Sequence, residues 1–138
     1  MPPRAKLRCV VDTNVWVSAL LSPPMMRLAR TLAARHRLLF SVEQLREFKE
    51  VIERPRLARY MTGTHQRELV AGMAADGELV LVISSVRVCR DPDDDHLLAL
   101  CKDGKADVLI TGDKDLLVLG HFGATRIITP SRFLVEHT

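Results

Sequence analysis

The chain has 138 residues, of which 47% are hydrophobic and 27% are charged. This size and balance predict one globular domain over residues 1–138 with its own core. No apolar run is long enough to cross a bilayer, and the N-terminus lacks the apolar segment of a signal peptide, so we expect a cytoplasmic protein without a membrane partner. The three cysteines lack the paired spacing of a zinc site or a disulfide framework.

The net charge of +3 is distributed unevenly along the chain. Residues 1–70 hold 13 Lys and Arg against 6 Asp and Glu, a charge of +7, whereas residues 71–138 hold 7 against 11, a charge of −4. This asymmetry indicates an anionic partner that contacts the first half and a cation held by the second half. The simpler interpretation, in which these charges only face solvent, stays open for each single arginine.

Apolar runs alternate with helical patterns along the whole chain. Strands are predicted at about residues 7–12, 37–40, 79–83, 106–111 and 125–128. Helices are predicted at about residues 15–21, 25–36, 41–54, 57–61, 65–75, 91–104, 113–119 and 131–136. Strands that alternate with helices are typical of an α/β fold, in which right-handed crossovers join a parallel sheet with helices on both faces.

Single residues predict several helix boundaries. The Ser22-Pro23-Pro24 sequence should interrupt the helical pattern, because proline removes a backbone donor. Ser41 should cap the helix that follows it, and Asp91 should cap the helix in which Pro92 takes the first position. Gly104 should end that helix.

Acidic residues gather where predicted strands end. Asp12 ends the first strand and Asp113 follows the fourth, so both carboxylates enter one crevice if these strands are neighbours. Asp94 begins the helix that leads into the fourth strand, and Glu47 lies on the helix after the second. Crowded carboxylates repel one another unless a cation joins them, and Mg²⁺ or Mn²⁺ prefers such oxygen ligands.

Four unrelated surface or capping acids would give the same spacing, so that interpretation stays open beside the metal site. Asp12 favours the metal site, because an unpaired charge at the end of a buried strand is costly and a capping role is not expected there. Other chemistries lack their motifs: the chain has no GxGxxG, P-loop, HExxH or GxSxG sequence. Asn14 occupies the position of the second acid that haloacid-dehalogenase-type phosphotransfer requires.

Four segments of the sequence together resemble one known family. They are VVDTNVWVSALLSPP, SVEQLREFKEVIERPRL, RDPDDDHLLALCKDGKADVLITGDKDLL and IITPSRFL, and in this order they extend over nearly the whole chain. The chain closely resembles PIN-domain proteins, especially their VapC-like toxin branch. The resemblance implies a three-layer α/β/α sandwich and a metal-dependent ribonuclease. The five strands predicted above would form the central parallel sheet of this sandwich.

The resemblance also implies roles for single residues. The acidic quartet of the family, which would be catalytic and bind Mg²⁺ or Mn²⁺, falls on Asp12, Glu47, Asp94 and Asp113. The family's accessory acid falls on Asp115. Three polar residues that would support the crevice fall on Asn14, Ser41 and Thr111.

Two positions depart from the family pattern. Asp95 stands where relatives often carry Asn, so either Asp94 or Asp95 could face the metal. We assign Asp94 to the metal, because it keeps the family's three-residue spacing from Asp91, and we place Asp95 on the helix surface. Cys101 replaces a usual Ala and should be neutral if it is buried.

The resemblance further implies an RNA substrate, a homodimer and a cognate antitoxin protein. Arg87 and Arg90 would lie near the crevice and position the RNA backbone. Exposed arginines at positions 27, 30 and 35 would add basic surface beside the crevice in the oligomer. The competing interpretation is a non-catalytic module that binds RNA or a protein on the same fold, and a phosphotransfer receiver is a third.

Overall fold

The computed structural model describes residues 6–59, 63–64, 67, 71, 75 and 77–137. Within them, a six-stranded sheet has the order β3-β2-β1-β4-β6-β5. The strands are β1 (Arg8–Val11), β2 (Arg37–Phe40), β3 (Glu78–Leu79), β4 (Val108–Ile110), β5 (His121–Phe122) and β6 (Thr125–Ile128). All neighbouring strands are parallel except β5 and β6, which are antiparallel.

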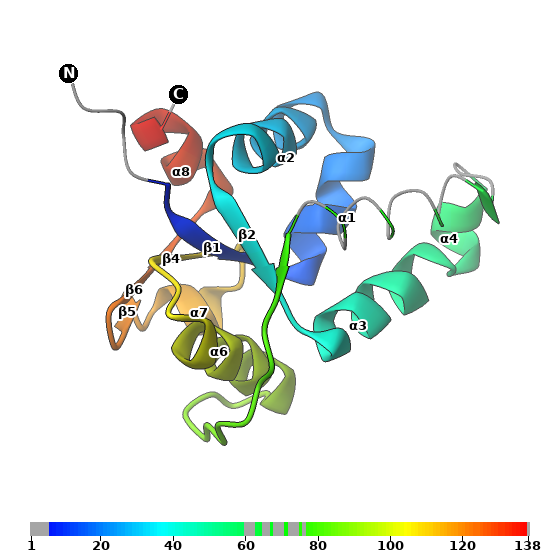
Figure 1. Ribbon diagram of the computed structural model, residues 1–138. Helices are drawn as coiled ribbons and strands as arrows, with labels where there is room; N and C mark the ends of the chain where they lie inside the picture. The colour runs from blue at the N-terminus through cyan, green and yellow to red at the C-terminus, as the bar shows by residue number, and fades with distance from the viewer. Residues whose placement is uncertain are drawn as a thin grey trace.

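Helices cover both faces of this sheet (Figure 1). They are α1 (Thr13–Leu21), α2 (Pro23–Arg35), α3 (Val42–Ile52), α4 (Pro55–Ala58), α6 (Pro92–Gly104), α7 (Lys114–Leu117) and α8 (Pro130–His137). In Figure 1, α2 and α8 lie on one side of the strands and α6 lies on the other. The prediction of an α/β/α arrangement is therefore confirmed.

Two apolar clusters join the helices to the sheet, one on each face. Cys9 and Val11 of β1 belong to the cluster that contains Phe133 of α8. Val10, which lies between them in the strand, belongs to the cluster that contains Leu98 of α6. This alternation follows from the strand geometry, and each fully buried aliphatic side chain stabilises the fold by about 1.5–3 kcal/mol.

The buried cysteines behave as small core residues. Burial raises the pKa of the Cys9 and Cys101 thiols to about 12, so both stay protonated near neutral pH. Cys101 is 1% exposed and packs in the cluster on the α6 face. Cys101 is therefore buried, which is the condition under which we expect the replacement of the usual Ala to be neutral.

The sheet has one strand more than the five predicted, and this strand, β5, is antiparallel. Gly120 and Gly123 have positive φ angles of 69° and 57°, a region that glycine enters without steric cost. The chain can therefore reverse after two residues, and Phe122 pairs with Thr125. A two-residue strand has no recognisable alternation, so the prediction of a wholly parallel five-stranded sheet was wrong at this edge.

β3 contains only Glu78 and Leu79, although an apolar run predicted a strand over residues 79–83. Beyond it, Asp103 of α6 accepts hydrogen bonds from the N–H groups of Ile83 and Ser84 at 2.7 and 2.8 Å. A carboxylate therefore satisfies these donors instead of a neighbouring strand. β1 and β4 are also one or two residues shorter at each end than predicted, which is ordinary for element boundaries.

Most helix boundaries follow the predicted signals. Ser41 and Asp91 cap α3 and α6. However, α2 begins at Pro23 and not at residue 25, because proline fits the first turn of a helix. Gly104 is the last residue of α6, and Lys105 ends the helix in the left-handed conformation with a φ of 52°.

α4 begins at Pro55, two residues before the helical turn predicted over residues 57–61. The end of that turn lies outside the described residues, as does most of the helix predicted over residues 65–75. Among the helices that the structure describes, none combines the length and the apolar character needed to cross a membrane.

Gly77 lets the chain approach β2 closely just before β3. A Cβ atom there would lie 2.6 Å from Cε1 of Phe40 and 3.1 Å from the carbonyl oxygen of Leu38. We expect Gly77→Ala to lower the free energy of unfolding by about 1–3 kcal/mol, because the buried ring must shift. Urea unfolding measures this. Gly112→Ala is the control, since a Cβ at Gly112 meets nothing within 4 Å, and equal losses in both variants would contradict the packing explanation.

Candidate metal centre

Asp12 and Asp113 follow neighbouring parallel strands, as predicted. β1 and β4 pair with Val11 opposite Ile110, and both acids line a hollow of about 380 Å³ at the carboxyl end of the sheet. Thr111 links them: its Oγ1 donates to Oδ2 of Asp12 at 2.8 Å and accepts from the N–H of Asp113 at 3.0 Å. The two carboxylates are therefore held on one wall of the same crevice.

Both acids also cap helices. Oδ1 of Asp12 accepts from the N–H of Asn14 at 3.2 Å, and Oδ1 of Asp113 accepts from the N–H of Asp115 at 2.8 Å. The expectation that capping does not explain an acid at a buried strand's end was wrong for Asp12, because α1 begins at the next residue. A carboxylate has about four lone-pair sites, so capping leaves both acids able to bind a cation.

Three carboxylates come together in this crevice. Asp94, Asp113 and Asp115 each offer an oxygen, and these three oxygens lie within 4.8 Å of one another. Asp94 is 7% exposed and enters from the first turn of α6, while the other two lie at the start of α7. We call these residues the three-acid group. Such oxygen ligands suit Mg²⁺ or Mn²⁺, which binds a few carboxylates and keeps several waters.

The electrostatics of the group favour a cation. Burial raises the pKa of the Asp94 carboxyl to about 7, and repulsion from the charges of Asp113 and Asp91 adds to this effect. Burial also raises the pKa of Asp12, although hydrogen bonds from Thr111 and Asn14 act in the opposite direction. A divalent cation would offset this repulsion and favour the charged form of each acid.

Glu47 lies outside the three-acid group, within electrostatic reach of Asp12 and Asp93. Burial, followed by the negative charges of Asp93 and Asp12, raises the pKa of its carboxyl. Glu47 and Asp93 line a second hollow of about 510 Å³, which adjoins the first at Asn14. The role of Glu47 as a fourth ligand stays a prediction.

Known proteins with similar sequences and structures agree with this acidic site. A family model described as PIN domain matches residues 8–115, which include all of these acids. The chain belongs to the PIN-domain family. Uncharacterized protein MJ1680 of Methanocaldococcus jannaschii is 30% identical over an alignment of 121 residues that covers 84% of this chain and 77% of that protein.

A solved structure shares the fold of this PIN domain. It is VapBC2 from Rickettsia felis bound to a DNA fragment from their promoter, and one of its chains superposes with a TM-score of 0.58. The match covers 89% of this chain and 98% of that chain, with 10% sequence identity. At this identity the likeness concerns the fold alone.

Asp95, the neighbour of Asp94 in this PIN domain, binds the backbone instead of joining the three-acid group. Its Oδ1 accepts hydrogen bonds from the N–H groups of Val88 and Cys89 at 2.9 and 2.7 Å. These bonds hold the pKa of the Asp95 carboxyl below its usual value. Asp95 therefore anchors the segment before α6, and this contact supports the assignment of Asp94 to the metal.

The three predicted polar supports occupy different places in the PIN domain. Thr111 bridges the two strand ends, as described above. Asn14 is exposed where the two hollows meet. Ser41 caps α3, and its Oγ accepts from the N–H of Gln44 at 3.0 Å and lies 3.4 Å from Nε2 of His96. Ser41 therefore supports the wall of the second hollow, which His96 lines, and does not contact the acids directly.

Sequence reasoning missed three residues of the second hollow. His96 is half-buried, and its Nε2 lies 2.6 Å from Oε2 of Glu43. Arg46 and Arg54 line the same hollow as Glu47. Helical spacing could have found part of this set, since positions 43, 46, 47 and 50 share one face of α3.

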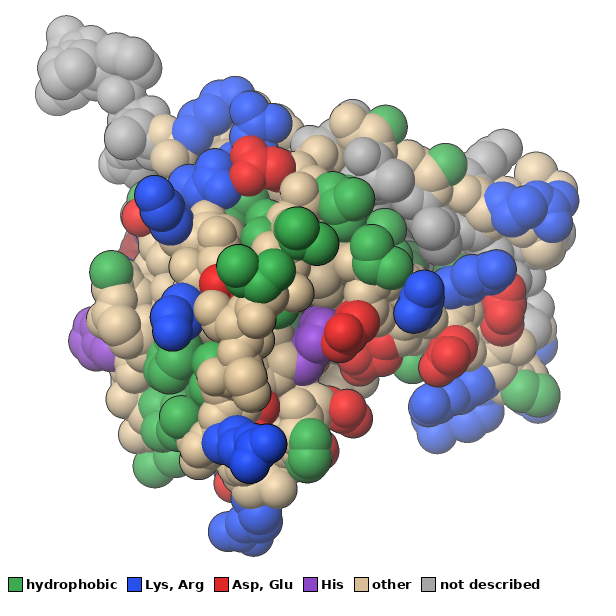
Figure 2. All heavy atoms as spheres, turned by 60° about the horizontal axis from the view of Figure 1, so that its bottom comes forward, with side chains coloured by type: hydrophobic (Ala, Val, Ile, Leu, Met, Phe, Trp, Pro, Cys, Tyr) green, Lys and Arg blue, Asp and Glu red, His purple; other side chains and the backbone are tan. Residues whose placement is uncertain are grey.

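Arg87 and Arg90 are exposed, and within the ranges that the structure describes no ion pair joins them to the acids. Figure 2 shows acidic side chains beside a histidine near the middle of one face and basic side chains toward the side where α3 and α4 lie. The two arginines that line the second hollow come from this side: Arg46 lies in α3, and Arg54 lies between α3 and α4. A role of Arg87 and Arg90 in RNA binding stays a prediction.

Proposed function

We propose that this PIN domain is an endoribonuclease that uses Mg²⁺ or Mn²⁺ to hydrolyse RNA phosphodiester bonds. The observation that carries the proposal is the three-acid group, whose oxygens lie within 4.8 Å of one another. The buried Asp94 supports it, because a carboxyl pKa raised to about 7 is typical of functional acids and is relieved by a cation. Family membership supports the same reaction, since PIN domains are typically nucleases.

Each acid has a task in the proposed site. Asp94, Asp113 and Asp115 would bind the ion, and Asp12 would reach it in the orientation that Thr111 fixes. Glu47 would complete the acidic set from α3. A bound divalent ion supplies Lewis-acid chemistry, which polarises the phosphodiester and makes an attacking water more acidic. No histidine base is required for this reaction.

We also propose a biological setting for the enzyme. It would be the toxin of a toxin–antitoxin pair, acting on RNA in the cytoplasm as a homodimer and silenced by a cognate antitoxin protein. The fold shared with a chain of the VapBC2 complex supports this proposal. The exposed arginines of α2, at positions 27, 30 and 35, would then add basic surface beside the crevice of the oligomer.

Incubation of the purified protein with a panel of labelled single-stranded and structured RNAs tests the proposal. We expect cleavage products with Mg²⁺ or Mn²⁺ and none with EDTA. Asp94→Asn, purified in parallel, controls for contaminating ribonucleases, because a contaminant would cleave equally in both preparations. The absence of metal-dependent cleavage across the panel would favour the non-catalytic binding module.

A further inference from the structure

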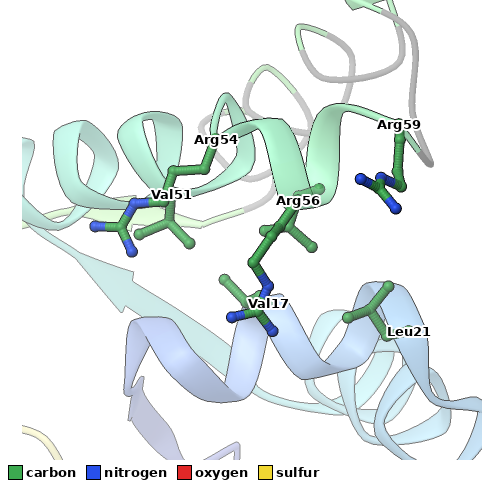
Figure 3. A pocket seen from close by; sticks show the side chains of 7 residues that line it. Val17, Leu21, Val51, Arg54, Arg56 and Arg59 are labelled. Atoms are coloured by element: carbon green, nitrogen blue, oxygen red, sulfur yellow. The ribbon is translucent and has the colours of Figure 1, made fainter.

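A third hollow lies beyond the acidic crevice, between α1 and the α3–α4 segment (Figure 3). It has a volume of about 500 Å³. Its floor is formed by Val17 and Leu21 of α1, and its rim on the α3–α4 side is formed by Arg54, Arg56 and Arg59 together with Val51 and Leu57 (Figure 3). We call it the arginine hollow. In Figure 3, the side chain of Arg56 extends from α4 toward Val17 of α1.

The three arginines of the rim are available to a ligand. Arg54, Arg56 and Arg59 are exposed, and none forms an ion pair with a carboxylate in the described part of the chain. Unpaired guanidinium groups around an apolar floor complement a ligand in which negative charges alternate with flat apolar faces. Single-stranded RNA has this chemistry, since its phosphates bind basic side chains and its bases pack on apolar surface.

One face of α1 connects the arginine hollow to the acidic crevice. Asn14 and Ser18 line the crevice beside Asp113, while Val17 and Leu21 line the arginine hollow. Positions 14, 17, 18 and 21 share one helical face and extend over a rise of about 10 Å. A strand that leaves the three-acid group along α1 therefore reaches the arginines directly.

The alternative route, through the second hollow on the α3 side, is less favourable for a polyanion. That hollow is lined by four acidic side chains against two arginines. Like charges would repel a phosphate there, whereas the arginine hollow contains no acidic side chain among its described lining residues. The charge distribution therefore favours the path along α1.

We propose that the arginine hollow binds the nucleotides of a single-stranded RNA that flank the cleaved phosphodiester. The identity of the ligand rests on the proposed function, but its binding can be measured without cleavage. Arg56 and Arg59 contact phosphates, and Val17 and Leu21 receive bases. These arginines are positioning residues, because they set affinity and register and leave the chemistry to the three-acid group.

Fluorescence anisotropy of a short labelled single-stranded RNA, titrated with protein in EDTA at several salt concentrations, tests the proposal. Arg56→Gln with Arg59→Gln should weaken binding by about tenfold and reduce the slope of log K against log salt by about 1.4, or 0.7 for each lost phosphate contact. Arg56→Lys with Arg59→Lys should restore the slope, because the positive charges remain.

A matched control removes the same charge elsewhere. Lys6 and Lys102 are exposed near the amino end of the strands, away from the hollow. Lys6→Gln with Lys102→Gln should leave the affinity within about twofold of wild type and the slope unchanged. In cleavage assays, the glutamine variant of the two arginines should raise KM about tenfold and keep kcat within about twofold, as expected for lost uniform binding.

Two outcomes separate this proposal from the proposed function. The proposal would be overturned if the variant with Arg56→Gln and Arg59→Gln keeps the circular dichroism spectrum, the RNA affinity and the salt slope of wild type. An acidic protein would then be the favoured ligand of the hollow. Loss of affinity and slope without any metal-dependent cleavage would support the RNA site while the nuclease function fails.

Discussion

Asp94→Asn should reduce metal-dependent RNA cleavage by about a hundredfold or more. Asp94 is buried within the three-acid group, and the amide loses the negative charge that a cation requires. The substitution is nearly isosteric, so the fold should stay intact. Initial rates on labelled RNA at saturating Mn²⁺, together with the circular dichroism spectrum, measure both effects.

Asp95→Asn is the matched control, because it makes the same chemical change at the next residue of α6. The amide oxygen can still accept the hydrogen bonds from the N–H groups of Val88 and Cys89, so activity should stay within about threefold of wild type. If Asp95→Asn loses cleavage while Asp94→Asn retains it, Asp95 holds the ion and our assignment within the acidic run is wrong.

Without metal, the folded protein should lose stability as the pH rises from about 4 to about 7. The pKa of Asp94 is raised from 3.8 to about 7, so the folded state binds this proton more strongly than the unfolded chain. The resulting stabilisation is complete below pH 3.8 and is lost as the pH rises through 7, and it is on the order of 4 kcal/mol. The raised pKa values of Asp12 and Glu47 act in the same direction.

Other groups change stability in the opposite direction. The pKa values of Asp95, Asp103 and Glu136 are lowered, so their stabilisation is lost only as the pH falls below about 4. Burial lowers the pKa of His36, which opposes the effect of Asp94 within the window. Urea unfolding in EDTA should therefore compare wild type with Asp94→Asn at about pH 5 and about pH 7.5. Both proteins contain the other titrating groups, so the contributions of those groups drop out of the difference. The variant should lose less stability between the two pH values, and an equal loss would contradict the role of Asp94.

The part of the fold that carries the site could be predicted from the sequence. Residues 7–12 and 106–111 are apolar runs that suit buried parallel strands, and each leads into an acid. The carboxyl ends of neighbouring parallel strands meet at one edge, so Asp12 and Asp113 had to converge once β1 and β4 paired. The three-residue spacing between Asp91 and Asp94 likewise follows from one turn of a helix.

Other features depend on contacts that a local pattern does not contain. The hairpin of β5 rests on two glycine turns, and the early end of β3 rests on a carboxylate of α6 that is distant in sequence. Asp12 caps α1 because this helix begins at Thr13, whereas the sequence pattern predicted its start at residue 15. Arg54 lines the second hollow because it lies where α3 leads into α4. We instead expected Arg87 and Arg90 near the acids, because they are close to them in sequence.

The central claim is that the three-acid group, joined by Asp12, holds a divalent ion at the carboxyl ends of β1 and β4, and the melting temperature measured against Mn²⁺ tests it most directly. At Mn²⁺ about 100-fold above Kd, wild type should gain about 2.7 kcal/mol, or roughly 5–15 °C. Asp12→Asn should gain less than about half of this, and without metal it should melt at or above the wild-type temperature, because a poorly compensated buried charge is gone. Equal stabilisation of wild type and Asp12→Asn by Mn²⁺, or no stabilisation of either, would contradict the claim.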